Sequence, residues 1–375
     1  MLGIKLISLA KCLRFSSMIP AAKPIIGREE RKAVKRVLKS GMLAQGPEVA
    51  AFEKEFSNFV DAEHCIAINS GTSALHLALL AAEIQSGDEV IVPSFSFAAT
   101  ANVVALTGAT PVFADIDENT FNLDPRSVES LISPKTRAVM PVHLYGQPAQ
   151  VDEFTNICEK YGLLLFEDAA QAVGASFDGQ QVGTFGIAGS FSFYPTKNMT
   201  SGEGGMVATN DPEIARKIKL LRNQGMEKRY ANEIVGFNNR MTDIHAAIGR
   251  VQLKKLTDWT IARQKNAAFL TANLRNVITP SVIDKAVHVW HQYTIRITDQ
   301  NRDNFSEQLK KRGVGSGVYY PTPIHQLPSF SQSIDLPKTN QVSQECLSLP
   351  VHPSLSQRDL EKIVQSVNEI AKAGS

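Results

Sequence analysis

Between residues 65 and 210 the chain alternates short apolar runs with helical stretches, and this alternation restricts its fold more than any other feature. Several runs are almost continuously apolar, as in strands that helices cover on both faces. Helical stretches at 73–82 and 151–161 lie between them. The pattern predicts an α/β fold with a mostly parallel central sheet. The predicted strands are residues 65–69, 89–93, 110–115, 138–144, 163–167, 190–194 and 205–209.

The pattern changes beyond residue 210. A polar loop at 225–239 leads into a long predicted helix at 242–274, and a predicted strand at 288–296 follows. Further predicted segments are helices at 211–223, 302–312 and 357–371 and a proline-rich loop at 319–328. Because 375 residues exceed what one simple core organises, we expect a large domain over 18–255 and a smaller C-terminal α+β domain over 256–375.

The composition is that of an ordinary globular protein, with 43% hydrophobic and 20% charged residues. The formal net charge is only +2, so we expect neither nucleic acid nor a membrane as a main partner. No apolar run reaches transmembrane length. Cys12, Cys65, Cys158 and Cys346 are scattered without a CxxC pair, which favours reduced thiols in a cytoplasmic protein over disulfides or a zinc site.

Residues 1–17 are treated as an N-terminal extension. They carry Lys5, Lys11 and Arg14 and no acidic residue, and Lys11 ends an apolar stretch too short for a secretory signal. A targeting segment and a mis-assigned start are both open interpretations. We favour a start at Met18, since the segment that follows it resembles the beginning of an enzyme.

A turn between a predicted strand and a predicted helix could bind a phosphate. The segment Asn69-Ser-Gly-Thr-Ser-Ala-Leu-His76 places Thr72 and Ser73 at a helix start, where free N–H groups and the helix dipole attract anions. The segment matches neither GxxxxGK[ST] nor GxGxxG, so an NTPase or a dinucleotide fold is not supported. Taken alone, the two hydroxyl residues are better explained as an ordinary helix cap.

Two further segments follow predicted strands, at the sheet edge where α/β proteins bind ligands. The first contains Phe95 and Phe97, which could stack on a flat cofactor or belong to the core. The second contains Asp168 and Gln171. A carboxylate in a pocket needs a cationic partner, and the protonated pyridine nitrogen of pyridoxal phosphate is one, with Gln171 then near its phenolic oxygen. The alternative is an aspartate that caps a helix.

The segment Ser190-Phe-Ser-Phe-Tyr-Pro-Thr-Lys197 decides between these alternatives. Lys197 follows an apolar strand and precedes a glycine-rich loop, a sheltered position that suits a lysine which must lose its proton to attack an aldehyde. Ser192 could reach a phosphate. Most lysines are solvated surface residues. Combined with a phosphate turn, a stacking ring and a carboxylate, however, Lys197 predicts that pyridoxal 5'-phosphate is held as an internal aldimine.

From about residue 24 to residue 353 the chain resembles the sugar aminotransferases of the DegT/StrS type, in the aspartate-aminotransferase (fold type I) superfamily. The matching segments are Gly46-Pro-Glu-Val49, 69–74, 93–100, Pro141-Val-His-Leu-Tyr-Gly146, 167–171, 190–197, 202–205 and Gly236-Phe-Asn-Asn-Arg-Met-Thr-Asp243. The resemblance implies a pyridoxal-phosphate-dependent aminotransferase with the PLP-transferase fold, which has a large domain around a mixed, mostly parallel sheet.

The resemblance also implies roles for single residues around the cofactor ring. Lys197 would hold the cofactor and shuttle protons, Asp168 would contact the pyridine nitrogen, and Gln171 would lie near the phenolic oxygen. Phe97 would stack on the ring. Relatives that dehydrate sugars carry histidine in place of the lysine, so Lys197 favours transamination over dehydration.

Further residues are implied at the phosphate and at the subunit interface. Thr72, Ser73 and Ser192 would hold the phosphate. Asn238 and Arg240 would reach the cofactor of the neighbouring subunit. The implied working unit is therefore a homodimer with shared active sites.

The implied reaction moves an amino group from glutamate (or glutamine) to a keto sugar, in particular a nucleotide-diphosphate-linked keto-deoxyhexose. Tyr320 and His325 lie in a loop that faces the active site in relatives. Arg229, with Lys228 and Tyr230, lies in a polar loop that could meet the nucleotide diphosphate, and solvated loop residues are the alternative.

Some alternatives stay open, and other residues are not assigned to the site. A non-nucleotide ketone such as a keto-inositol could replace the sugar. A non-catalytic regulator with this fold would be expected to lack Lys197 or Asp168, and both are present. His143 and His291 have apolar neighbours and are interpreted as core histidines, and no metal site is expected.

Overall fold

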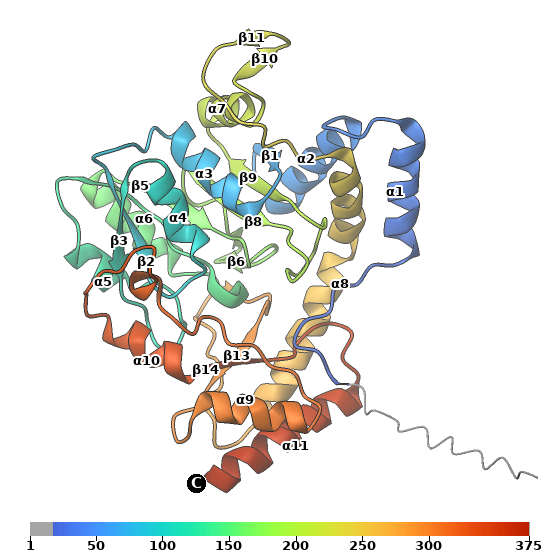
Figure 1. Cartoon of the computed structure of the whole chain (residues 1–375), viewed down its shortest axis with the longest axis vertical. Helices are drawn as coiled ribbons and strands as arrows, with labels where there is room; N and C mark the ends of the chain where they lie inside the picture. The colour runs from blue at the N-terminus through green and yellow to red at the C-terminus, as the bar shows by residue number, and fades with distance from the viewer. Residues whose placement is uncertain (1–17, 375) are drawn as a thin grey trace, which may run out of the picture.

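The computed structural model describes residues 18–374, so the extension at 1–17 lies outside the described residues. A seven-stranded sheet forms the centre of the molecule (Figure 1). Its strands stand in the order β1 (His64–Ile68), β9 (Gly205–Thr209), β8 (Ala188–Ser192), β5 (Leu164–Asp168), β4 (Thr136–Val139), β2 (Glu89–Pro93) and β3 (Thr110–Ala114). Only β9 runs antiparallel to its neighbours within this sheet. The predicted α/β class with a mostly parallel mixed sheet is confirmed.

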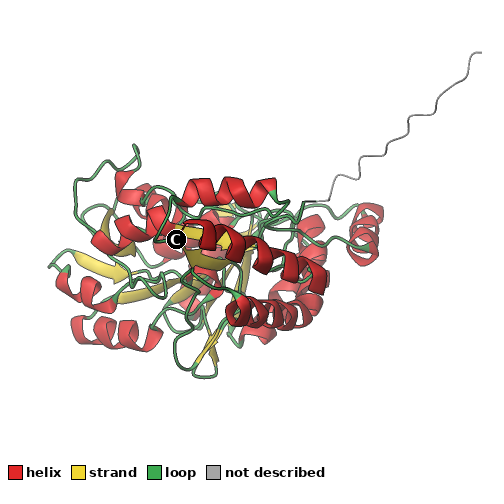
Figure 2. Ribbon diagram, turned by 90° about the horizontal axis from the view of Figure 1, so that it is seen from below, coloured by secondary structure: helices red, strands yellow, loops and turns green. Residues whose placement is uncertain are grey.

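Helices cover both faces of the sheet (Figure 2) because its strands are apolar on both sides. Strand β1 shows the two-residue period: Ile66 and Ile68 join one buried cluster, and Cys65 and Ala67 join another. The first face carries α3 (Gly71–Ala81), α4 (Ala99–Leu106) and α7 (Pro212–Arg222). The second carries α2 (Pro47–Val60), α5 (Pro125–Ser130), α6 (Val151–Tyr161) and part of α8 (Asp243–Asn273).

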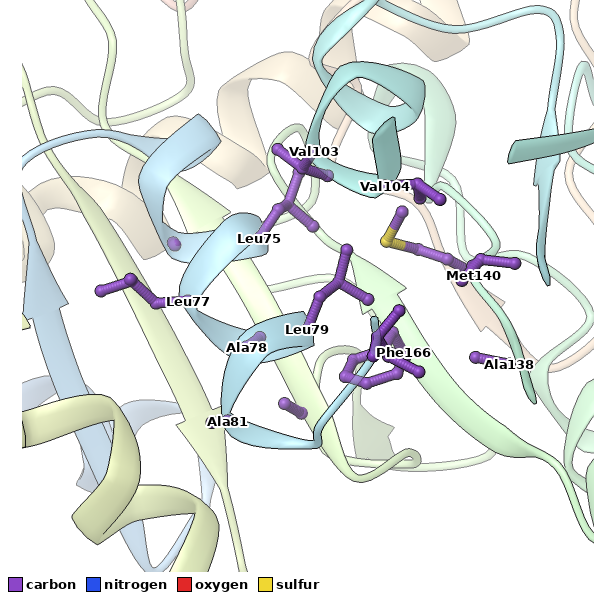
Figure 3. Close-up of a cluster of buried hydrophobic side chains, with 14 of the residues drawn as sticks. Leu75, Leu77, Ala78, Leu79, Ala81, Val103, Val104, Ala138, Met140 and Phe166 are labelled. Atoms are coloured by element: carbon purple, nitrogen blue, oxygen red, sulfur yellow. The ribbon is translucent and has the colours of Figure 1, made fainter. Parts of the chain in front are cut away.

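The packing on the first face fixes where α3 begins. Leu75 and Leu79 of α3 point toward Val103 of α4 and toward Met140 and Phe166, as Figure 3 shows. These side chains are all fully or almost fully buried. The start of α3, and with it the predicted phosphate turn, is therefore held against the carboxyl ends of the central strands.

Apart from the clusters on the two faces of the sheet, a further buried cluster lies in the C-terminal part of the chain. It joins the second half of α8 to α9 (Arg302–Lys311), α11 (Gln357–Gly374), β13 (Tyr293–Arg296) and β14 (Cys346–Leu349). Ile19 also belongs to this cluster and pairs with Val314. The predicted domain boundary at 255 falls within α8, which runs from one cluster to the other (Figure 1).

The remaining elements are short or lie at the edges. The hairpin of β10 and β11 projects from the body near α7 (Figure 1). No helix among the described residues is long and apolar enough to cross a membrane. The bounds are α1 (Arg28–Ser40), η1 (Leu144–Gly146), β6 (Ser176–Phe177), β7 (Gln180–Gln181), β10 (Met226–Lys228), β11 (Ala231–Asn232), β12 (Ala286–Val287), η2 (Ile324–Gln326) and α10 (Pro337–Glu345).

Two predicted strands are shorter than expected. The strand at 138–144 ends at Val139, because Pro141 has no N–H to donate to a neighbouring strand. The strand at 288–296 forms ladder pairs only over Tyr293–Arg296. The backbone carbonyls of residues 288–291 accept hydrogen bonds from side chains instead of from a neighbouring strand.

Candidate active site

A cavity of about 600 Å³ opens at the carboxyl ends of β1, β2, β5 and β8. It therefore lies at the sheet edge where α/β folds bind ligands. Seven of the predicted site residues line it: Thr72, Phe97, Asp168, Gln171, Ser192, Lys197 and Tyr320. These residues are far apart in the sequence, and the parallel strands bring them to one place.

Asp168 is the last residue of β5, and its carboxylate is only 4% exposed at the cavity wall. The Thr100 hydroxyl donates a hydrogen bond of 2.8 Å to Oδ2, and the Ala170 N–H donates one of 3.1 Å to Oδ1. Burial raises the pKa of Asp168, while these hydrogen bonds and the charge of Lys197 oppose the rise. No arginine or lysine among the described residues forms a salt bridge with Asp168. The site therefore favours a ligand that brings its own positive charge.

Lys197 lies five residues beyond the end of β8 and turns into the same cavity. Its backbone N–H donates to the Tyr194 carbonyl at 2.9 Å, which closes the turn. The side chain is half-buried because it borders the cavity. Loss of hydration lowers the pKa of Lys197 to about 8, although the charge of Asp168 opposes this. An appreciable fraction of the amine is therefore neutral at physiological pH.

The start of α3 lies at the cavity wall, where a helix N-terminus suits an anion. Ser70 is the helix cap, since its hydroxyl accepts the Ser73 N–H at 3.1 Å. This leaves Thr72 exposed to the cavity, opposite the Ser192 hydroxyl. A Cβ on Gly71 would lie 2.7 Å from the Ser192 Cβ, so the close approach of helix and strand requires glycine there. Ser73 does not line the cavity, because its hydroxyl is bonded to Ser70 at 3.0 Å.

The two phenylalanines that follow β2 have different surroundings. Phe95 is buried in the core, whereas Phe97 is 61% exposed at the cavity. The Phe97 ring lies 6.1 Å from the Tyr320 ring, centroid to centroid. Gln171 donates from Nε2 to the Tyr320 hydroxyl at 3.1 Å and accepts the Tyr145 N–H at 2.8 Å, so its amide orientation is fixed. Phe97 is thus the ring available to a flat ligand.

Three other predicted residues lie outside the cavity. His325 is buried, and its Nδ1 lies 2.7 Å from the Ser94 hydroxyl. Arg229 is exposed beside the β10–β11 hairpin, where its guanidinium stacks on Tyr230 at 4.9 Å. Asn238 is exposed on the segment that follows this hairpin. Within this chain none of the three lines the cavity, so any role for Arg229 and Asn238 needs a second subunit.

The two histidines interpreted as core residues differ. His143 is fully buried, accepts the Ala149 N–H at Nδ1 (3.0 Å) and lies 3.1 Å from Glu167 through Nε2, so the core interpretation fits it. His291 is also buried, at 6% exposed, but unlike His143 it borders the cavity. Its neighbours in sequence are apolar, and no motif marked it. Only the folded chain shows which way its ring points.

Comparison with known proteins agrees with this geometry. Residues 24–368 match the DegT/DnrJ/EryC1/StrS aminotransferase family. The chain belongs to this family. Its predicted fold class and its assignment as a pyridoxal-phosphate-dependent aminotransferase are thereby confirmed.

Relatives of this DegT/DnrJ/EryC1/StrS aminotransferase include enzymes named for sugar substrates. It is 40% identical to the GDP-perosamine synthase of Caulobacter vibrioides over 364 residues, which cover 94% of this chain and 98% of the relative. It is equally identical to a pleiotropic regulatory protein of Geobacillus stearothermophilus, with 91% and 94% covered. The structure of DesV from Streptomyces venezuelae, described as a complex with a ketimine intermediate, superimposes with a TM-score of 0.88, 39% identity, and 92% and 94% covered.

Proposed function

We propose that this chain moves an amino group from glutamate or glutamine to a keto sugar carried on a nucleoside diphosphate, with pyridoxal phosphate as its cofactor. One observation carries the proposal: Asp168, Lys197 and the anion-binding turn at Thr72 all face one cavity. The relatives named for nucleotide-sugar reactions support the substrate class.

The residues present fit pyridoxal phosphate. The cofactor has an anionic phosphate, a flat ring, a ring nitrogen that carries a proton and an aldehyde. The cavity offers a helix start with Thr72 and Ser192, the exposed ring of Phe97, the buried carboxylate of Asp168 and the amine of Lys197. Each chemical group of the cofactor thus has a complementary residue, and Asp168 gains the positive charge that it otherwise lacks.

When bound, the cofactor supplies an electron-accepting ring that stabilises the negative charge left on a substrate carbon after it loses a proton. The protein must keep the carboxyl group of Asp168 and the amine of Lys197 in the protonation states that the reaction requires. The Thr100 and Ala170 hydrogen bonds favour the ionised form of Asp168 against the effect of burial, and this carboxylate would keep the ring nitrogen protonated. Lys197 would hold the cofactor through its aldehyde, and its amine would accept and return the substrate proton. A pKa near 8 suits both tasks.

Three residues that line the cavity would orient the cofactor ring: Phe97, Gln171 and Tyr320. Phe97 would cover one face of the ring. Gln171 lies at the wall with its amide fixed by Tyr145 and Tyr320, so its position changes little when a ligand enters. Burial raises the pKa of Tyr320, which keeps its hydroxyl protonated as a donor to the ligand side of the cavity.

We infer that the working unit is a homodimer in which Asn238, Arg240 and Arg229 act on the neighbouring subunit. The hairpin region exposes large apolar side chains, with Tyr230 81% and Val235 91% exposed. Exposed apolar side chains of this size are typical of a surface that a second subunit covers. The segment that follows the hairpin reaches the start of α3, where the Asn69 N–H donates to the Asn239 carbonyl.

The absorption spectrum of the purified protein tests the first half of the reaction. With pyridoxal phosphate bound through Lys197, we expect a visible band that glutamate converts into the shorter-wavelength band of the aminated cofactor. Lys197→Ala should bind the cofactor without that link and should lose steady-state turnover. No cofactor band after reconstitution, or full turnover by Lys197→Ala, would contradict the proposal.

A panel of ketones tests the second half. We expect the aminated enzyme to react with dTDP- or GDP-linked keto-6-deoxyhexoses and to return the visible band. Reaction with a keto-inositol but with no nucleotide sugar would favour the alternative substrate. A cofactor-bound protein that responds to neither glutamate nor glutamine would point instead to a regulator.

A further inference from the structure

The cavity wall at residues 288–292 is held in place in an unusual way. Three side chains donate hydrogen bonds to four consecutive backbone carbonyls of this segment. Gln264 donates to the carbonyl of His288 at 3.2 Å, Asn198 to that of Val289 at 2.8 Å, and Arg263 to those of Trp290 and His291 at 3.0 and 3.5 Å. Trp290 has a positive φ of 50°, which is costly for a bulky residue, so these hydrogen bonds hold a strained backbone.

Arg263 is the most costly of these donors. It lies in α8, is 7% exposed, and forms no ion pair with a carboxylate in the described part of the chain. Burial lowers the pKa of this guanidinium to about 10. A buried cation whose only partners are carbonyl groups destabilises a fold unless the geometry that it fixes is useful. What Arg263 fixes is the backbone at His291, a residue that faces the cavity.

The hydrogen bonds of His291 determine where its proton lies. Nδ1 is 3.3 Å from Oδ1 of Asn198, whose Nδ2 already donates to the Val289 carbonyl. Because Oδ1 can only accept, Nδ1 must carry the proton. Burial and the charges of Lys197 and Arg263 lower the pKa of His291 well below its usual value, so the ring is neutral. Nε2 is then an unprotonated acceptor.

Nε2 of His291 has no hydrogen-bond partner among the described residues, although the ring borders the cavity. The neighbouring His288 is different. Its Nδ1 accepts the Trp290 N–H at 2.8 Å, its other hydrogen bond goes to the Gly146 backbone, and its ring stacks on Trp290 at 3.9 Å. His288 is thus fully used by the protein, whereas His291 presents one free acceptor to a ligand.

The chemistry of the two substrates decides which one this acceptor can contact. The amino group of an amino-acid donor is the group that is transferred to the cofactor, so only its carboxylates remain for recognition. Carboxylates are acceptors only and gain nothing from an unprotonated nitrogen. Sugar hydroxyls are donors. We propose, on the basis of the proposed sugar aminotransferase function, that His291 is a specificity-determining residue whose Nε2 accepts a hydrogen bond from a hydroxyl of the keto sugar, and that Arg263 is its positioning residue.

Three substitutions at His291 separate this role from a structural one. In His291→Gln, Oε1 can take the place of Nε2, so the acceptor is kept. His291→Asn keeps a donor to Asn198 but leaves no atom at the cavity, and His291→Phe removes both polar atoms. With dTDP- or GDP-linked keto-6-deoxyhexoses, we expect KM to rise about tenfold in the Asn and Phe variants, as for loss of one neutral hydrogen bond, and to be largely rescued in the Gln variant.

The ratio between the two half-reactions is the decisive kinetic measurement. The sugar half-reaction should be impaired about tenfold more than the glutamate half-reaction, each followed by the cofactor band. Equal impairment of both would overturn the proposal, because His291 would then act on the cofactor or on Lys197. If the unaltered enzyme does not react with glutamate at all, the proposed function fails. The assignment of His291 as an acceptor then depends only on which of its ring nitrogens carries the proton.

Ring-nitrogen NMR of histidine-labelled enzyme measures that proton without any sugar. We expect a neutral His291 with its proton on Nδ1, identified by the signal that disappears in His291→Gln. A proton on Nε2 would leave no acceptor at the cavity and would contradict the proposal. Arg263→Met should raise the KM for the sugar, and Arg263→Lys should restore it in part. Gln264→Ala removes the hydrogen bond to the His288 carbonyl, farther from His291 in the same wall, and should have a smaller effect.

Discussion

Replacement of Lys197 by methionine should make the cofactor-free protein more stable over a defined pH range. Methionine has a similar length and no charge, so it removes the cost of burying an ammonium group. The pKa of Lys197 falls from 10.5 to about 8 in the folded chain. At about 1.4 kcal/mol per pH unit, the buried charge costs the folded state roughly 3 kcal/mol below pH 8 as an upper limit.

The sign of the pH dependence follows from proton counting. Between pH 8 and pH 10.5 the unfolded chain holds a proton on Lys197 that the folded chain has lost. The free energy of unfolding therefore rises with pH in that range, by roughly 2 kcal/mol from pH 8 to pH 10. In Lys197→Met this rise should be absent. In Asp168→Asn it should begin below pH 8, because the charge of Asp168 is what opposes the fall in the lysine pKa.

Urea unfolding of cofactor-free protein at a series of pH values measures this effect. All variants should be compared at one protein concentration, since association would shift the midpoint. The decisive quantity is the difference between the unaltered chain and Lys197→Met as a function of pH. Parallel curves from pH 8 to pH 10 would show that Lys197 keeps an ordinary pKa, and the argument for its role as a base would lose its electrostatic support.

Other predictions concern the carboxylate and the second subunit. Asp168→Asn should slow the glutamate half-reaction by on the order of 10²-fold or more, measured by stopped-flow absorbance, because the ring nitrogen loses its buried counter-charge. Thr100→Val removes a donor that lowers the pKa of Asp168, so the acidic limb of the rate–pH profile should move to higher pH. In purified hybrid dimers of Lys197→Ala and Asn238→Ala chains, about half of the activity should return if Asn238 acts in trans, since one site is then intact; no recovery would place Asn238 in its own subunit's site.

Local patterns predict the central sheet well because each buried strand is apolar over its whole length. The predicted strands at 89–93 and 205–209 and the helix at 151–161 have the bounds that the structure shows. Helix α4 (Ala99–Leu106) was not predicted, since its sequence is apolar on nearly all sides and has no helical period. Local pattern also could not predict that the strand at 288–296 is interrupted, because the partners of its carbonyls lie on α8 and beside Lys197.

The same limit applies within the cavity. Asp168 and Lys197 could be predicted because each follows a recognisable strand. Thr72 and Ser73 are adjacent, and no sequence pattern says which hydroxyl faces the ligand; the structure decides, since Ser70 already bonds to Ser73. His325 resembled a site residue in sequence, yet its contact with Ser94 turns it into the interior. Side-chain direction depends on neighbours that are distant in the chain.

The charge of the cavity gives an independent reason to expect a second subunit. Both proposed substrates are anionic, since glutamate carries two carboxylates and a nucleotide sugar carries a diphosphate. Among the described residues that line the cavity, Lys197 is the only lysine and there is no arginine, while Asp168 and Glu203 add negative charge. In the proposed function Lys197 is bonded to the cofactor, so it would not also hold a carboxylate.

The missing positive charge must therefore come from outside this chain's own cavity wall. The exposed residues of the projecting hairpin region, Lys228 and Arg229, carry such charge and have no carboxylate partner within salt-bridge distance in the described chain. A neighbouring subunit that placed its hairpin over the cavity would supply both the guanidinium and the apolar cover that Tyr230 offers. On this argument one chain provides most of the cofactor site, to which Asn238 of a neighbouring subunit would add, but only part of a site for the substrates.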